Sequence, residues 1–179
     1  MSSSILKIYT PGIIVVFLYV FSLPAIAQNF GSAPSLRQLT RDSGYIFAGR
    51  VTAIERVPAS ATPEVATVKI TFEVDQGIRG VRTGQMLVIR EWGGLWEHGE
   101  RYRPGEQVLL FLYRPSKLGL TSPVAGALGR FAVDKGGQIN LQQDRFAALA
   151  SDSAEVRLQG KNRVSSRDFA AVIRRMAKE

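Results

Sequence analysis

The chain has no cysteine and a single histidine among its 179 residues. Without cysteine there is no disulfide framework, no thiol nucleophile and no thiol to carry a lipid at the mature N-terminus. A serine nucleophile that needs an imidazole base has His98 alone to use, and no Gly-x-Ser-x-Gly motif occurs. An envelope hydrolase that uses the His98 loop is therefore the weakest of the functional alternatives, and we predict no catalytic residues.

One apolar run stands out near the N-terminus. Lys7 precedes the run at 12–23, and small residues follow at Ala25 and Ala27. A basic start, a short apolar core and a small-x-small site predict a signal peptide over residues 1–27, cleaved between Ala27 and Gln28. The run is shorter than the roughly 20 residues that cross a bilayer, and an uncleaved anchor is the alternative. We therefore expect an exported protein, periplasmic or secreted, whose mature form does not span the membrane.

Basic residues outnumber acidic ones, 23 to 15, which gives a net charge of +8. Loss of Lys7 with the signal peptide lowers this charge to +7. Arginine is the commoner cation, and its planar guanidinium favours paired contacts with carboxylates and phosphates. An exported basic protein can meet an anionic glycan, lipid head groups or an acidic protein, whereas nucleic acid is not an expected partner. The alternative is that the charge serves solubility alone.

Alternating apolar and polar residues predict a mainly β protein. In residues 66–75, Ala66, Val68, Ile70, Phe72 and Val74 fall on one face, as expected for an antiparallel strand with one wet side. Further strands are predicted at 45–57, 85–92 and 106–113, the last apolar on both faces and therefore central. Residues 129–134 and 138–141 form a predicted hairpin around Gly136 and Gly137. Five or six short strands favour a small OB-like antiparallel barrel over residues 44–142.

Helices are predicted on either side of the barrel. Residues 28–43 form a lead-in with a short helix capped by Ser35. The C-terminal segment 143–179 contains an amphipathic helix at about 166–178, capped by Ser165 and Asp168. Its apolar residues recur at helical spacing, so we expect the helix to dock on the body; a membrane-surface helix is the alternative. Gly49, inside the first strand, indicates a bulge or a bend.

The segment between two predicted strands, Gly93–Gly105, gathers the rarest residues of the chain. Aromatic rings and guanidinium groups on one loop are typical of ligand recognition by stacking and charge pairing. The alternative is that the tryptophans plug one end of the barrel. If the protein binds a ligand or partner, we expect contacts from this segment and its borders, namely Trp92, Trp96, His98, Arg101, Tyr102 and Arg103.

Carboxylates in the same segment raise two further hypotheses. Glu97, His98 and Glu100 offer zinc ligands in principle, but they crowd into four positions and no second histidine exists to complete the set. We therefore predict a solvated loop, with neither a metal nor a cofactor. Paired catalytic carboxylates, as in glycosidases, are defined by their separation in space. Because the glutamates alternate here with arginines, surface ion pairs are the favoured interpretation.

Five groups of residues carry a resemblance to a known family. They are Ile46-Phe47-x-Gly49-x-Val51 with Ile54-Glu55, Val74-x-x-Gly77-x-x-Gly80, Gly93-Gly94, Arg103-Pro-Gly-Glu-Gln-Val-Leu-Leu-Phe-Leu112 and Gly129-x-Phe131-x-Val133. In this pattern the chain resembles small exported bacterial proteins without an assigned function. Those proteins are similar to the netrin-like module and to the N-terminal domain of tissue inhibitors of metalloproteinases. The resemblance covers about residues 42–141 and implies an OB barrel with flanking helices.

The resemblance implies binding and no particular catalytic chemistry. The metalloproteinase inhibitors chelate the target's zinc through an N-terminal cysteine, whereas this chain would begin at Gln28 and has no cysteine. No functional residue can be carried over from the inhibitors. We expect a non-enzymatic exported domain that binds a protein, a protease among the candidates, or another macromolecule. A basic module that binds polyanions or glycans is the alternative.

Overall fold

A computed structural model of the chain describes residues 34–59, 65–97, 101–141 and 163–178. The predicted signal peptide and its cleavage site, Ala27 and Gln28, lie outside these residues. The chain divides into Met1–Phe30 and Gly31–Glu179. Every element described below belongs to the second of these units.

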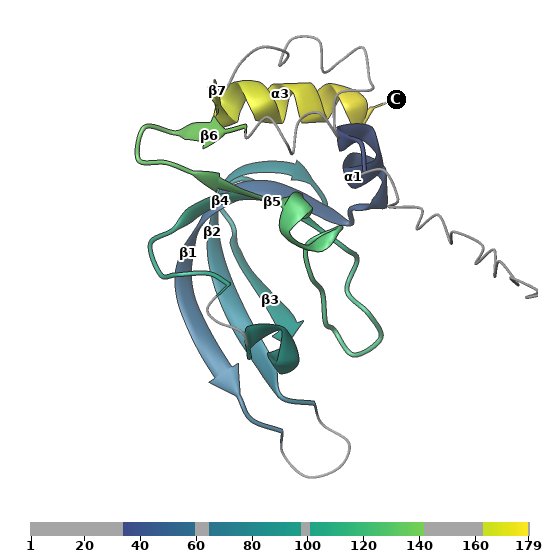
Figure 1. Ribbon diagram of the computed structural model, residues 1–179, viewed down its shortest axis with the longest axis vertical. Helices are drawn as coiled ribbons and strands as arrows, with labels where there is room; N and C mark the ends of the chain where they lie inside the picture. The colour runs from purple at the N-terminus through teal and green to yellow at the C-terminus, as the bar shows by residue number, and fades with distance from the viewer. Residues whose placement is uncertain (1–33, 60–64, 98–100, 142–162, 179) are drawn as a thin grey trace, which may run out of the picture. The chain divides into compact units, whose positions relative to one another are not determined.

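The described residues form one antiparallel sheet flanked by two α-helices (Figure 1). Neighbouring strands follow the order β3-β2-β1-β4-β5-β6-β7. The strands are β1 (Tyr45–Val57), β2 (Thr67–Arg79), β3 (Met86–Trp92), β4 (Gln107–Leu112), β5 (Arg130–Val133), β6 (Gln138–Asn140) and β7 (Arg163–Ser165). The helices are α1 (Leu36–Asp42) and α3 (Ser166–Met176), with short 3-10 turns η1 (Gly93–Trp96) and η2 (Gly126–Gly129).

The sequence prediction of a mainly β protein, with a short helix before the strands and another helix toward the C-terminus, is confirmed. Two details differ. The strand β2 continues through Gly77 to Arg79, whereas the sequence predicted a strand that ends at Asp75. The sheet also has seven strands in place of five or six, because β7 adds to β6 with Val164 opposite Ile139. Along this order β3 and β7 are the two edges, and the strand pairing does not close into a ring.

Gly49 explains how β1 and β2 come together at a bulge. The register between the two strands shifts between Ala48 and Gly49. A Cβ atom built on Gly49 would lie 2.5 Å from the carbonyl oxygen of Glu73 on β2. Only glycine therefore allows the two backbones to approach this closely. The bulge expected from the sequence is present at this position.

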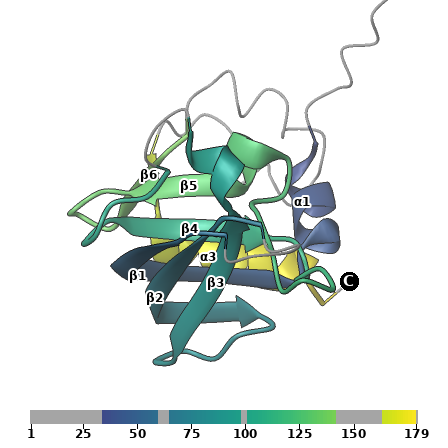
Figure 2. The same ribbon diagram turned by 90° about the horizontal axis from the view of Figure 1, so that it is seen from below.

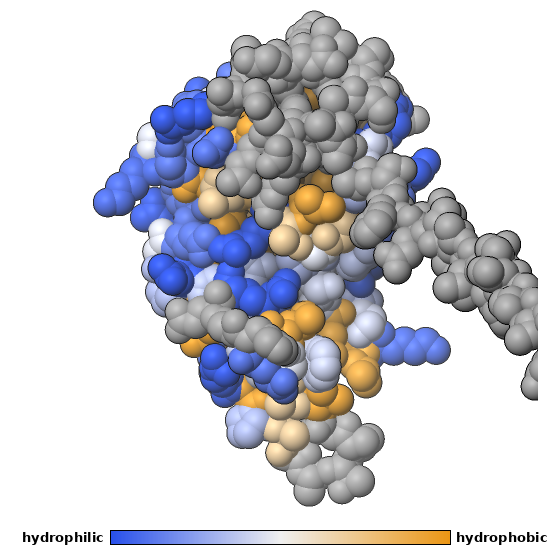
Figure 3. Space-filling view, viewed as in Figure 1, coloured by the Kyte–Doolittle hydropathy of each residue, from blue (hydrophilic) through white to orange (hydrophobic). Residues whose placement is uncertain are grey.

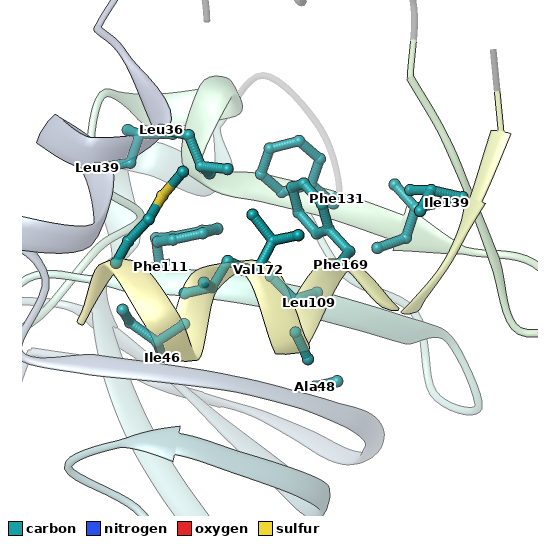
Figure 4. Packing of buried hydrophobic residues seen from close by; sticks show 14 of the residues in the cluster. Leu36, Leu39, Ile46, Ala48, Leu109, Phe111, Phe131, Ile139, Phe169 and Val172 are labelled. Atoms are coloured by element: carbon teal, nitrogen blue, oxygen red, sulfur yellow. The ribbon is translucent and has the colours of Figure 1, made fainter. Parts of the chain in front are cut away.

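The central strands are buried on both faces. Residues Val108–Leu112 of β4 are fully buried, which confirms the central position expected from its apolar sequence. On one face, Leu109 and Phe111 pack with Ile46 of β1 under α1 and α3 (Figure 4). Phe131 stands edge-on between the rings of Phe111 and Phe169. The protein has two hydrophobic cores, one on each face of the sheet, and the core on this helix-covered face is the larger.

Helix α3 docks on the body as its apolar spacing predicts. Its buried side chains, Phe169, Val172, Ile173 and Met176, all belong to the helix-covered core. The Ser165 hydroxyl oxygen accepts the N–H of Asp168 at 3.1 Å and donates to that residue's carboxylate at 2.8 Å. Figure 2 shows the helix behind β1–β4. The membrane-surface alternative therefore loses its premise, because the apolar stripe is used inside the protein.

Arg79, at the end of β2, ties the ends of both helices to the sheet. Its guanidinium donates to the carbonyl of Thr40 and, at 3.4 Å each, to those of Ser43 and Ala177. The last carbonyl groups of a helix lack partners within the helix, so a cation that donates to them is stabilising. One side chain thus joins α1, β2 and α3.

The second core lies on the opposite face of the sheet. It contains Phe47, Phe72 and Leu110 together with two side chains from the segment after β3, Trp96 and Tyr102. The connection from β4 to β5 also reaches across to β3, because Thr121 N–H donates to the carbonyl of Arg90 at 2.8 Å. The same connection bonds β4 through Tyr113 and Phe111. It therefore spans the gap between β4 and the edge strand β3.

Candidate functional site

The candidate segment from the sequence is built around one buried carboxylate, that of Glu91. In β3 the side chains alternate, so Ile89 and Glu91 point inward while Arg90 and Trp92 point outward. Glu91 is completely buried. A buried carboxylate is costly unless its oxygens are hydrogen-bonded or paired with a cation. The residues that follow β3 supply those partners.

Three side chains of the segment converge on Glu91. The indole Nε1 of Trp96 donates to Oε2 at 3.0 Å, and the hydroxyl of Tyr102 donates to Oε1 at 3.3 Å. Arg101 forms an ion pair, with Nε 3.0 Å from Oε2. Both oxygens of Glu91 are therefore engaged inside the protein. This carboxylate holds the segment in place and offers no free oxygen to a substrate.

A second group of charges surrounds these residues. The guanidinium carbon of Arg130 lies 4.9 Å from the centre of the Tyr102 ring, and Arg130 is ion-paired with Glu106. Arg56 lies over the Trp96 ring at 6.0 Å, at the outer limit for an attractive contact. Arg101 thus pairs with Glu91 of β3, and Glu106 pairs with Arg130 of β5.

Burial dominates the electrostatics of this cluster. Desolvation raises the pKa of the Glu91 carboxyl, while Arg101 and the donors on Trp96 and Tyr102 act in the opposite direction. Burial, followed by the charge of Glu91, also raises the pKa of the Tyr102 hydroxyl. Tyr102 therefore stays a hydrogen-bond donor throughout the physiological range.

The structure separates the residues that the sequence brought together as a site. Trp96 and Tyr102 are 2% and 1% exposed, so their rings offer no surface to a ligand. Trp96 is buried in the second core, as the alternative interpretation held, but Trp92, which that interpretation also placed inside, is 50% exposed. Arg101 is partly buried against Glu91. Trp92 and Arg103 are exposed, and Arg103 takes part in further interactions of its own.

The remaining predicted residue, His98, lies outside the described residues, as does Glu100. Among the residues that the structure does describe, no group of three or more His, Asp and Glu side chains lies close enough to hold a metal ion. Glu91 and Arg130 were not singled out from the sequence. The sequence signal that could have identified Glu91 is its spacing of two residues from Ile89, which places both side chains on the inward face of β3.

A different surface emerges at the edge strand. Among the residues that the structure describes, the large apolar side chains that are at least 42% exposed all belong to β3 or to the segments hydrogen-bonded to its ends; they are Val65, Met86, Val88, Trp92, Tyr113 and Leu118. We call these six residues the β3 surface. Gly93 N–H donates to Ala66, next to Val65, and Thr121 joins the Tyr113–Leu118 segment to β3. Figure 3 shows apolar and polar side chains interspersed on the face of the molecule seen in Figure 1.

The charges that accompany the β3 surface are positive. Arg90 lies between Val88 and Trp92 on β3. Arg114 and Lys117 lie in the segment 113–122, which follows β4. All three side chains are exposed. Within residues 86–92 and 113–122 the one carboxylate is that of Glu91, which is buried. An exposed carboxylate, that of Glu73, lies on β2 directly opposite Met86. The surface therefore combines apolar and cationic character.

Part of the β3 edge keeps its backbone open. Gln85 and Gly93 bond the neighbouring β2 segment, so the alternate residues Met86, Val88 and Arg90 turn their peptide groups outward. Thr121 binds the carbonyl of Arg90. In the described part of the chain, the outward peptide groups of Met86 and Val88 have no partner. The connection after β4 thus shortens the exposed edge, a common protection against pairing with other chains.

A polar hollow of about 210 Å³ lies elsewhere, where the start of α3 meets β1, β2 and β4. Asp75, Gln76, Gln107 and Ser166 contribute to its walls. Desolvation raises the pKa of the Asp75 carboxyl, and the nearby Arg50 opposes that shift. The hollow is smaller than pockets that enclose drug-sized ligands. It has room for water or one small polar group.

Comparison with known proteins gives no family for the chain: no family model matches it, and no curated protein matches it either. Neither α1 nor α3, the helices of the described residues, is long and apolar enough to cross a membrane. The functional argument therefore depends on the two features above, the buried Glu91 cluster and the β3 surface.

Proposed function

We propose that the protein is an exported, non-enzymatic binding domain with an OB-like, netrin-like fold, which contacts a protein or other macromolecular partner through the β3 surface. One observation carries the proposal: of the six exposed apolar side chains, Met86, Val88 and Trp92 lie on one face of β3, and the other three belong to segments hydrogen-bonded to β3 or to the residue that follows it. Scattered exposed apolar residues are ordinary, but a gathered apolar patch with a polar rim is typical of an interaction site.

The fold part of the proposal is supported by the strand order and by the β4–β5 connection. A barrel requires the two ends of a curved row of strands to approach each other. Here Thr121 joins that connection to β3, while Tyr113 and Val124 keep it bonded to the neighbourhood of β4. The loop thus bridges β3 and β4, while the two ends of the strand row, β3 and β7, are not paired with each other in the described residues. An OB fold is itself a partly open barrel.

The absence of catalysis in the proposal is supported by the state of Glu91. It is the most deeply buried carboxylate of the described residues, and both its oxygens accept hydrogen bonds from the protein. A general acid or base needs contact with the reacting group. Glu91 is enclosed by the segment that it anchors, so its carboxylate stabilises the fold and does not contact a reacting group.

A site-specific photo-cross-linking experiment tests the proposal. A photoreactive side chain is placed at Val88 and, as a matched control, at Ala132, which is also exposed on a strand but lies on β5. In an extract of the compartment that holds the protein, we expect adducts at position 88 that excess unlabelled chain suppresses. The change Trp92→Asp should abolish them. Equal adducts at positions 88 and 132 would contradict the proposal.

A further inference from the structure

The turn Ser116–Leu120, beside the β3 edge, carries the most exposed member of the β3 surface. Leu118 is 68% exposed at its centre, between Lys117 and Gly119. Gly119 has a φ of 72°, the left-handed conformation that lets the chain reverse in so few residues. The turn thus presents a large apolar side chain and a cation side by side.

Most of the N–H groups of this turn are satisfied internally. The Ser116 hydroxyl accepts the N–H groups of Leu118 and Leu120 at 3.3 and 3.2 Å. The Ser116 carbonyl accepts from Gly119, and the Ser116 N–H donates to the carbonyl of Leu120, at 2.8 Å each. Four of the five N–H groups of the turn are therefore paired without water. Such pairing is what a loop needs before it can leave water for an apolar phase.

The rest of the β3 surface has the composition of a membrane interface. Trp92 and Tyr113 are amphipathic rings, of the kind that settle at the level of lipid head groups. Arg90, Arg114 and Lys117 combine long apolar stems with cationic ends that reach toward phosphate. Because the two segments carry no exposed carboxylate, their charge complements an anionic bilayer.

We propose that the β3 surface docks on an anionic lipid bilayer, with Leu118 at the tip of the inserted turn and with Arg90, Arg114 and Lys117 against the head groups. This inference rests on the proposed function, because it names the partner of the same surface. The open peptide groups of Met86 and Val88 stay in the polar head-group layer, where water and phosphate satisfy them. Exposed Glu73, opposite Met86, limits insertion at that end.

The chain carries its own reporter for this contact. It has two tryptophans; Trp96 is buried in the second core, while Trp92 belongs to the β3 surface. The full chain is mixed with vesicles of phosphatidylcholine containing 30 mol% (roughly one lipid in three) phosphatidylglycerol, with brominated acyl chains as quencher. Quenching of Trp92 then reports the β3 surface itself, and the variant Trp92→Phe supplies the background from Trp96.

We expect strong quenching of Trp92 by anionic vesicles, and weak quenching by vesicles of phosphatidylcholine alone. Lys117→Glu should weaken binding by about tenfold, since each cation near the surface contributes roughly a fivefold factor and the reversal also adds repulsion. Leu118→Ser should reduce it by about tenfold through lost burial. The control Lys135→Glu, an exposed cation of the β5–β6 turn, should leave quenching unchanged.

The outcomes of the two experiments distinguish a failure of the lipid inference from a failure of the proposed function. If Trp92 is not quenched, or if Lys135→Glu weakens quenching as much as Lys117→Glu, the lipid inference is wrong. If Val88 then still cross-links specifically to a protein, the binding domain stands and its partner is a protein. If position 88 also gives no specific adduct, both proposals fail. Circular dichroism of each variant verifies that the fold is retained.

Discussion

Trp96 and Glu91 meet inside the protein, where the indole N–H donates to the carboxylate at 3.0 Å. The tryptophan that looked like a recognition residue thus serves to satisfy a buried charge. Together with Tyr102 and Arg101, it fixes the segment after β3 against the second core. Stability of this segment is therefore coupled to the protonation of one side chain.

The first prediction concerns pH. Burial raises the pKa of Glu91 above its value in the unfolded chain. A carboxyl group with a raised folded pKa contributes stability that is fully present below the unfolded pKa and is lost as pH rises through the folded pKa. We expect the free energy of unfolding of the parent, relative to Glu91→Gln, to fall as pH rises from about 4.5. Urea unfolding of both chains across pH 4.5–7.5 (roughly the titration range of a raised carboxyl) measures this; a relative stability that rises with pH would contradict it.

The second prediction concerns the Tyr102 hydroxyl. Tyr102→Phe keeps the ring beneath Arg130 but removes the donor to Glu91 Oε1. A buried acceptor left without its donor costs about 1–3 kcal/mol, and we expect that loss in the free energy of unfolding. The control Tyr113→Phe removes an exposed hydroxyl that accepts one long bond, from the N–H of Ala125 at 3.4 Å, and should change stability by less than about 0.5 kcal/mol. Equal effects of the two substitutions would argue against the buried network.

The third prediction concerns the bulge in β1. In Gly49→Ala the new methyl group would lie 2.5 Å from the carbonyl oxygen of Glu73, so β1 and β2 must separate. We expect destabilisation of about 1–3 kcal/mol, as for overpacked sites. Gly136→Ala is the control, because its Cβ meets a movable side-chain atom, Asp134 Oδ1, at 3.3 Å. Thermal unfolding of the two variants compares them directly.

The fourth prediction concerns Arg79, which donates to carbonyl groups of both helices. Arg79→Gln removes a charged donor from Thr40, Ser43 and Ala177 and should lower the free energy of unfolding by about 1.5–3 kcal/mol. Arg82→Gln, three residues along the chain and exposed, should have almost no effect. Hydrogen exchange in the last turn of α3 should accelerate only in the first variant.

Most of the fold was accessible from the sequence because its signals are local. Alternation in β2 and β3, the apolar run of β4 and the caps of α1 and α3 each lie within a few neighbouring residues. The strand β7 was missed, because Arg163–Ser165 is too short to show a period and exists through its pairing with Gln138–Asn140. Continuation of β2 through Gly77 was missed for a related reason: glycine normally interrupts a strand, but here a Cβ atom built on Gly77 would lie 2.4 Å from the carbonyl oxygen of Val81.

The candidate site was harder to predict than the fold. Rare residues drew attention to Trp96 and Tyr102, yet their polar atoms point to Glu91 from 5 and 11 positions away. The β3 surface was hidden because exposure of Met86, Val88 and Leu118 depends on which strand forms the edge. Strand order is a property of the whole sheet, and alternation within one strand does not reveal it.

The cover of the helix-side core is made by residues that are synthesised after β1–β6. Until residues 163–176 are present, Ile46, Leu109, Phe111 and Phe131 have α1 but no α3 to pack against. The growing chain therefore carries an uncovered apolar sheet during translation, and a chaperone would find its binding site there. Premature termination before Arg163 should accordingly yield an aggregation-prone product, even though β1–β6 are encoded in full.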